Sequence, residues 1–224
     1  MTELLDAAVD EACDEIVRVG TSLFNRGYVH ASAGNISARV GDRHLITPTD
    51  AALGFLERDR LALVDAQGEQ IAGDRASKTL TLHRRIYAAD PTARFVIHTH
   101  STHLVALTLA GVWSQDDVLP PITPYFVMKV GHVPLIPYHR PGDPRVADLV
   151  TARIADHQAS RTPIRAVLLD RLGPVVWGPE AAAALAVLEE LEETARLWLL
   201  TDRRPEPLTT DAIGELRATF GAAW

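Results

Sequence analysis

Two histidines one residue apart, His98 and His100, follow directly on the apolar run Phe95-Val-Ile. In an extended chain, side chains two residues apart point to the same side of the strand. Two imidazoles on one side, at the end of a buried strand, form a geometry that binds a transition metal. The same pair could be two ordinary polar residues at a strand end, so the surrounding residues must decide.

Apolar periodicity and turn residues around the pair predict a fold with many short elements. Helices alternate with short strands without long βαβ repeats, so we expect one α/β domain over residues 1–224. Its sheet should be central, largely antiparallel and flanked by helices. The predicted helices span residues 3–27, 77–89, 102–110, 145–157, 179–201 and 210–219, and the predicted strands span 35–40, 44–47, 61–64, 94–97, 129–136, 166–169 and 174–177.

The composition of the 224 residues excludes several classes of protein. A net charge of −7 without a basic patch argues against nucleic acid as a partner. Cys13 is the only cysteine, so a thiolate metal cage and an intrachain disulfide are both excluded. No apolar run is long enough to cross a membrane, and the first residues do not resemble a signal peptide. We therefore expect a cytoplasmic protein with no nucleic-acid partner and no membrane partner.

Two sets of short fragments, in order along the chain, carry a family resemblance. The first set is Ser32-Ala-Gly-Asn35-Ile-Ser37, Leu45-Ile-Thr-Pro-Thr49, Gly73-Asp-Arg-Ala-Ser77-Lys78, Val96-Ile-His98-Thr-His100-Ser101 and Gly173-Pro-Val-Val176. Together these fragments resemble the class II aldolase/adducin-like family. The second set is Thr123-Pro-Tyr125-Phe-Val-Met-Lys-Val-Gly131, Pro137-Tyr-His-Arg-Pro-Gly-Asp143 and Leu188-Glu-Glu-Leu-Glu-Glu-Thr-Ala-Arg196. With it, the closest resemblance within the family is to the 3-oxo-tetronate 4-phosphate decarboxylases and, next, to fuculose-phosphate aldolase.

The resemblance implies a metal-dependent lyase. Its members hold a divalent metal, usually zinc, with three histidines, and iron and manganese are the alternatives here. They form homotetramers with active sites between neighbouring subunits. The metal acts as a Lewis acid while a bond next to a carbonyl breaks and an enediolate forms. For this chain the resemblance implies aldol cleavage or decarboxylation of a small hydroxylated keto acid or sugar.

The family's functional residues carry over position by position. His98 and His100 match the first two metal ligands. Four residues fall where the family binds the substrate phosphate, and their amide, hydroxyl and ammonium groups suit an anion: Asn35, Thr49, Ser77 and Lys78. Tyr125 falls where the aldolases place a proton-donating tyrosine, which acts in a neighbouring subunit's site. An interface or core tyrosine is the other interpretation of Tyr125.

Three residues depart from the family pattern at functional positions. Thr79 stands where the family has a glutamate that serves as acid and base, and a threonine hydroxyl does not ionise near neutral pH. Leu172 replaces the third metal-binding histidine. Asp50 replaces a glycine that lets the backbone approach the phosphate, and its charge opposes an anionic ligand. We therefore expect a substrate that has diverged from the family's phosphate esters.

Other side chains could replace the lost ligand, and other functions stay open. Asp170, His103 and His139 are the candidates for the third ligand. Asp170 would give a two-histidine, one-carboxylate set, as in non-haem iron enzymes. The alternatives to a lyase are thus a repurposed oxygenase or dehydratase on a non-phosphorylated substrate, or a non-catalytic family member. The apolar residues 220–224, ending in Trp224, could pack over a neighbouring subunit or back onto their own.

Overall fold

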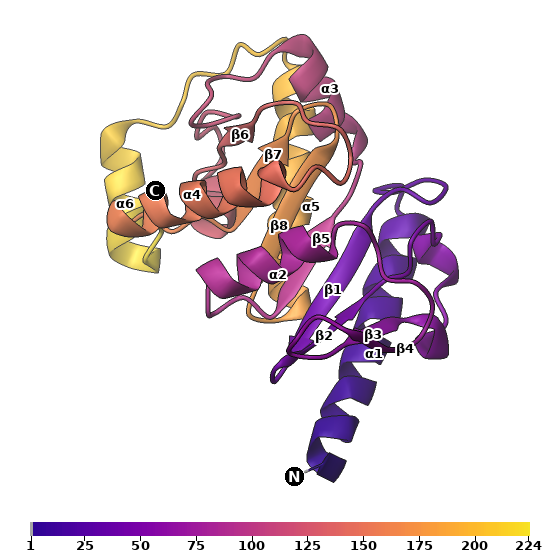
Figure 1. The fold of residues 1–224 in the computed structure, drawn as a ribbon. Helices are drawn as coiled ribbons and strands as arrows, with labels where there is room; N and C mark the ends of the chain where they lie inside the picture. The colour runs from indigo at the N-terminus through magenta and orange to yellow at the C-terminus, as the bar shows by residue number, and fades with distance from the viewer. Residues whose placement is uncertain (1) are drawn as a thin grey trace.

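The chain folds around one eight-stranded sheet, as the computed structural model shows (Figure 1). The structure describes the backbone of residues 2–224 and the side chains of residues 7–224, so Met1 of the predicted domain lies outside the described residues. The strand order is β4-β3-β2-β1-β5-β8-β7-β6. Every neighbouring pair is antiparallel except β6 and β7, which confirms the predicted α/β fold with a largely antiparallel sheet.

The strands are β1 (Asn35–Val40), β2 (Arg43–Ile46), β3 (Ala62–Val64), β4 (Gln70–Ala72), β5 (Phe95–His98), β6 (Leu135–Ile136), β7 (Ala166–Leu169) and β8 (Gly173–Gly178). The α-helices are α1 (Thr2–Asn25), α2 (Leu80–Ala89), α3 (Thr102–Ala110), α4 (Arg145–Ala159), α5 (Ala181–Leu200) and α6 (Thr210–Phe220). Short 3-10 turns, η1 (Leu53–Phe55) and η2 (Arg58–Arg60), and a π-helical turn, η3 (Phe126–Val130), complete the elements.

Helices cover the sheet from two sides, and β5 shows how its side chains divide between them. Phe95 and Ile97 join the apolar cluster that packs against α1, α3 and α5. Val96 joins the cluster formed with α2 and α4. Because side chains alternate along a strand, His98 follows Val96 onto the side of α2 and α4. The alternation of β5 thus decides which helices stand next to the histidine pair.

The structure differs from the prediction at three elements. The predicted strand 129–136 is wrong over most of its length, because a π-helical turn precedes β6 at Leu135–Ile136. Its apolar residues resemble a strand by composition, but Phe126 and Val130 are buried together at a helical spacing. Strand β4 was not predicted, since all its side chains are exposed. Helix α2 begins at Leu80 instead of residue 77, which leaves residues 77–79 as a loop.

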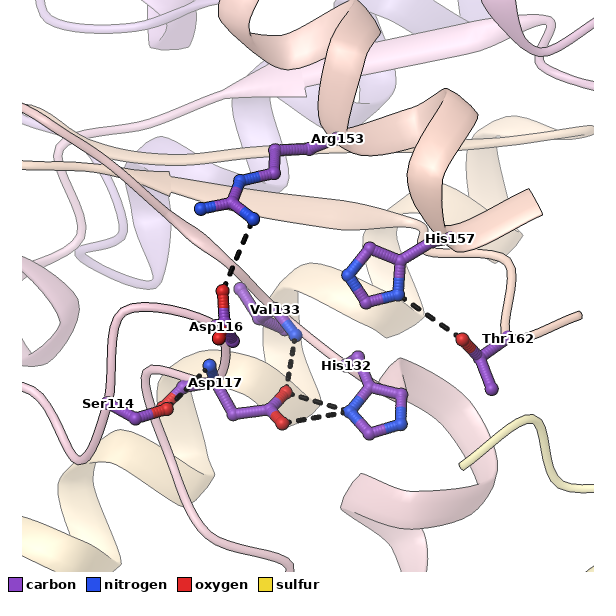
Figure 2. A network of polar contacts seen from close by, with 8 residues as sticks. All are labelled: Ser114, Asp116, Asp117, His132, Val133, Arg153, His157 and Thr162. Atoms are coloured by element: carbon purple, nitrogen blue, oxygen red, sulfur yellow. Dashed lines mark hydrogen bonds and ion pairs between the residues drawn. The ribbon is translucent and has the colours of Figure 1, made fainter. Parts of the chain in front are cut away.

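The last residues pack back onto their own chain. The Trp224 ring stacks on the His132 imidazole with centroids 4.4 Å apart and meets the Phe126 ring edge-on at 5.6 Å. Both carboxylate oxygens of Asp117 lie 2.9 Å from Nδ1 of His132, and the His157 ring lies 5.7 Å away (Figure 2). We call these residues, Asp117, His132, His157 and Trp224, the Trp224 cluster. Within the described part of the chain, no helix combines the length and hydropathy of a membrane span.

Candidate active site

One cavity of about 310 Å³ brings together all the predicted site residues except Tyr125. It opens between the carboxyl end of β5, the loop before α2 and the loop before α4. The predicted residues that line it are Asn35, Thr49, Ser77, Lys78, His98 and His100. These residues come from segments up to 65 positions apart, so their meeting in one cavity is a result of the fold.

Strand pairing holds the two halves of this cavity in register. Asn35, the first residue of β1, stands opposite His98, the last residue of β5. The loop that follows β2 lies against the loop that precedes α2, because the Thr49 amide donates to the Arg75 carbonyl at 2.9 Å and the Ser77 amide donates to the Thr47 carbonyl at 3.2 Å. The predicted anion-binding residues are therefore held beside the histidines by backbone hydrogen bonds.

The two histidines have the form that a metal requires. Their ring centroids lie 5.0 Å apart. Nδ1 of His98 donates to the Pro174 carbonyl at 2.8 Å, so its Nε2 carries the free lone pair. Burial, together with the His100 imidazole, lowers the pKa of His98 to about 4, although the Pro174 hydrogen bond raises it. Burial and then the neighbouring His30 imidazole lower the pKa of His100. Both rings are therefore neutral at pH 7.

Two glycines allow the backbone to close around the end of β5. Gly34 has φ +88°, and a Cβ there would lie 2.7 Å from the His98 carbonyl oxygen. Gly173 has φ +109°, and a Cβ there would lie 2.3 Å from the Thr99 carbonyl oxygen. Side chains rarely adopt this backbone conformation and would clash at both positions. The glycines of two resemblance fragments thus have a geometric role beside His98 and His100.

The three departures from the family pattern all line the same cavity. Thr79 is in the loop at the start of α2, and its hydroxyl lies 2.9 Å from that of Ser77. Leu172 faces the cavity from the turn before β8. Asp50 has φ +57°, so it keeps a left-handed backbone conformation that favours glycine. Its side chain is exposed at the cavity rim, where the carboxylate can point to solvent.

None of the candidate third ligands lines the cavity. His103 turns to the buried Glu192, with 2.8 Å between its Nδ1 and the carboxylate oxygen. Nδ1 of His139 contacts the Pro137 carbonyl of its own loop at 2.8 Å. Asp170 is absent from the lining as well. Among the described residues, no group of three or more histidine, cysteine or acidic side chains is arranged to hold a metal.

Residues missed by sequence reasoning also line the cavity, above all His83 and Arg140. His83 lies on α2 one helical turn after Thr79, the position where the family has its glutamate, so both side chains lie on the same face of the helix. The spacing could be seen in the sequence, but the sequence did not show that this face of the helix lines the cavity. Arg140 adds a second cation to the lining, besides Lys78. The nearby Asp143 pairs with Arg145, which donates a hydrogen bond to its carboxylate at 2.7 Å. The hydrogen bonds from Arg145 hold the pKa of the Asp143 carboxyl well below its usual range.

Tyr125 lies outside this cavity. It precedes the π-helical turn η3, and 61% of its surface is exposed. A core role is therefore wrong. Its exposure leaves the ring free to meet another subunit.

Comparison with known proteins identifies the family of the chain. A model of the class II aldolase and adducin N-terminal domain matches residues 14–199. The 3-oxo-tetronate 4-phosphate decarboxylase of Cupriavidus necator is 56% identical over 216 residues, which cover 94% of this chain and 96% of that protein. The chain belongs to the class II aldolase and adducin family. The resemblance stated from the sequence is confirmed.

More distant relatives agree with this membership. The L-fuculose phosphate aldolase of Methanocaldococcus jannaschii is 32% identical over 186 residues, covering 83% of this chain and 94% of that protein. The crystal structure of YgbL from Klebsiella pneumoniae superimposes with a TM-score of 0.84 at 44% identity, covering 94% of this chain and 99% of that one. Since the named relatives are decarboxylases and aldolases, the prediction of an enzyme of the lyase class is confirmed.

Proposed function

We propose that this chain is a metal-dependent carbon–carbon lyase that breaks a bond next to the carbonyl of a small hydroxylated keto acid. One observation carries the proposal: a neutral imidazole pair lies in the same cavity as two cations and several hydroxyl donors. A keto acid needs these groups together. Its carboxylate or other anionic end requires cations, while the carbonyl requires a group that accepts the charge of the enediolate.

The residues present fit a divalent metal through two imidazoles. His98 and His100 would hold it, most simply as zinc, with iron and manganese as alternatives. When bound, the metal supplies Lewis-acid polarisation of the substrate oxygens. The third histidine of the family is Leu172 here, so the protein contributes fewer ligands, and we expect weaker metal binding than a three-histidine site gives.

The cations and hydroxyl groups bind and orient the substrate. Lys78 and Arg140 attract its anionic groups, and the hydroxyls of Thr49 and Ser77 donate hydrogen bonds. The amino end of α2 lies next to these hydroxyls and adds its dipole. Asp50 at the rim opposes a doubly charged phosphate, so we propose that an unphosphorylated keto acid or sugar competes well with a phosphate ester.

A panel of substrates tests this proposal. The purified protein, loaded with zinc, manganese or ferrous iron, is assayed with 3-oxo-tetronate, its 4-phosphate, fuculose and fuculose 1-phosphate. Release of carbon dioxide or aldehyde is the expected result, with the unphosphorylated acid turned over at a comparable kcat/KM. Stoichiometric metal without turnover of any of these compounds would contradict a lyase and favour the non-catalytic alternative.

The assembly and the role of Tyr125 form a second part of the proposal. We propose a cytoplasmic homotetramer of one-domain subunits, residues 1–224, in which exposed Tyr125 reaches a neighbouring subunit's cavity. Light scattering gives the oligomeric state. Mixing a Tyr125→Phe subunit with a His98→Ala subunit should restore part of the activity, since each mixed pair of neighbours contains one intact site. Failure of the mixture to recover activity, with both variants tetrameric, would place Tyr125 outside the site.

A further inference from the structure

His83 is a buried histidine with an unpaired ring nitrogen at the cavity. Its side chain is fully buried, and its Nε2 has no hydrogen-bond partner in the described structure. The residue also lines the cavity that holds His98 and His100. A buried polar atom without a partner destabilises the folded state, so such atoms in a native protein require an explanation. A ligand bound in the cavity would supply the missing hydrogen-bond partner of Nε2.

A chain of hydrogen bonds fixes the orientation of this imidazole. The hydroxyl of Ser37 lies 2.7 Å from Nδ1 of His83 and 2.7 Å from the hydroxyl of Tyr87. All three side chains are buried. The ring therefore cannot turn without breaking a buried hydrogen bond, and Nε2 stays directed away from Ser37.

The same chain indicates which nitrogen carries the hydrogen. The buried hydroxyl of Tyr87 needs an acceptor for its hydrogen, and the oxygen of Ser37 lies 2.7 Å away. With that hydrogen donated to Ser37, the Ser37 hydroxyl donates to Nδ1 of His83. Nδ1 is then an acceptor, and Nε2 carries the hydrogen. The cavity thus contains a fixed N–H donor that needs an acceptor.

The position of His83 matches a need that the departures create. It stands one helical turn from Thr79, whose hydroxyl cannot replace the acid and base function of a glutamate near neutral pH. Helix α2 packs on the side of the sheet onto which His98 points, so His83 lies on the same side as the histidine pair.

We propose that His83 is a catalytic residue whose Nε2–H donates a hydrogen bond to the substrate oxygen that becomes negative when the carbon–carbon bond breaks. Ser37 and Tyr87 are its positioning residues. In decarboxylation the bond to the carboxylate breaks, carbon dioxide leaves, and the electron pair moves onto the adjacent carbonyl oxygen. A proton from water later restores the carbon. This role rests on the proposed lyase function, but the contact itself can be measured separately.

The first experiment follows enediolate formation without the labile keto acid. Dihydroxyacetone phosphate, the product expected from 3-oxo-tetronate 4-phosphate, is incubated with zinc-loaded enzyme in D₂O. A C–H bond next to the carbonyl breaks, its proton goes to solvent, and a deuteron returns to the same carbon. His83→Leu should slow this exchange about 100-fold with little change in metal content. His83→Gln, which keeps an N–H near the position of Nε2, should exchange about tenfold faster than His83→Leu.

Matched variants separate this role from a structural one. His139→Gln removes an imidazole from outside the cavity and should exchange at the wild-type rate. Ser37→Ala keeps the His83 ring but removes its fixed orientation, and should slow exchange about tenfold by lowering kcat with KM nearly unchanged. A His83→Leu variant that folds, retains metal and exchanges within twofold of wild type would overturn the proposal.

The second experiment reads the contact directly and does not depend on turnover. In protein labelled with ¹⁵N-histidine, two-bond ¹H–¹⁵N spectra should show the Nε2–H form of His83. Dihydroxyacetone phosphate should shift that nitrogen and leave His139 unmoved. An Nδ1–H form, or no shift at saturating probe, would contradict the inference even if His83→Leu fails to fold. A change in the Nε2 chemical shift without deuterium exchange or turnover would instead contradict the lyase function alone, and His83 would still be a ligand-binding residue.

Discussion

The molecule contains two groups of buried or half-buried histidines, and they differ in what each ring contacts. In the cavity, His98 and His83 have one ring nitrogen fixed by a hydrogen bond and the other left open. In the Trp224 cluster, His132 faces the carboxylate of Asp117 (Figure 2). The Trp224 ring stacks on the same imidazole. Four buried side-chain atoms lack partners among the described residues; two of them, in Asn35 and His83, line the cavity and none lies in the cluster.

This difference separates a site from a structural anchor by physical criteria. A neutral imidazole with an open nitrogen is ready for a metal or substrate, whereas one paired with a carboxylate and stacked on an aromatic ring contributes its contacts to folding. The cavity also keeps Asp50 in a left-handed conformation. Unpaired atoms and backbone strain lower stability, so they are expected where function requires them. The comparison can be tested by changing one group at a time.

The largest effect is expected from His98→Ala. Removal of one of two imidazole ligands should lower zinc affinity at least 1,000-fold and abolish turnover, because the protein supplies no third ligand in its place. Metal content after dialysis, measured by mass spectrometry, checks this. His132→Ala is the matched control from the Trp224 cluster and should keep full metal content. Equal metal loss in both variants would erase the distinction between the two groups.

Acid should destabilise the protein through its buried neutral histidines. His44, which packs beside Tyr87, has its pKa lowered to about 4, chiefly by burial. Between pH 6.5 and pH 4 the unfolded chain binds a proton at His44 that the folded chain does not, so stability is complete above pH 6.5 and falls toward pH 4. The slope is at most roughly 1.4 kcal/mol per pH unit for this residue. Urea unfolding at several pH values should show a shallower slope in His44→Gln.

Restoring a histidine at position 172 tests whether the cavity can hold a metal with three imidazoles. Leu172→His places an imidazole on the turn that faces His98 and His100 across the cavity. A third ligand should raise zinc affinity on the order of 10–100-fold, the scale on which changes around metal sites act. Titration against a chelator of known affinity measures it. An unchanged affinity would show that the pair does not direct its open nitrogens toward Leu172.

Truncation of Trp224 should act on stability alone. Trp224→Ala removes ring contacts with His132 and Phe126, and we expect the free energy of unfolding to fall by about 1–2 kcal/mol, less than for a core aromatic residue. Zinc affinity and turnover should stay within twofold of wild type. Loss of metal in this variant would mean that the Trp224 cluster supports the cavity, contrary to the comparison.

The sequence predicted those features that depend on local pattern or on ordered motifs. The strand predicted at residues 94–97 is Phe95–His98 in the structure, and the helix predicted at residues 102–110 is Thr102–Ala110. Both elements and the family could be predicted, because apolar periodicity and the order of the fragments are properties of the sequence itself. The role of His83 was not, since it depends on helix α2 packing beside β5 and on a hydroxyl of Ser37 that is 46 positions away. The sequence also could not show that His103 points away from the cavity, because its partner Glu192 lies 89 positions away in the sequence.

The smallest expected effect concerns Asp50, where strain in the cavity can be removed without touching a ligand. Asp50→Gly relieves a left-handed conformation, so we expect stability to rise by up to about 1 kcal/mol, partly offset by the greater freedom of glycine in the unfolded chain. The loss of a negative charge should also raise affinity for dihydroxyacetone phosphate several-fold more than for dihydroxyacetone. Thermal unfolding and calorimetric binding measure both effects. Equal gains for the two ligands would show that Asp50 points to solvent and that the cavity, despite its departures, still accepts a phosphate.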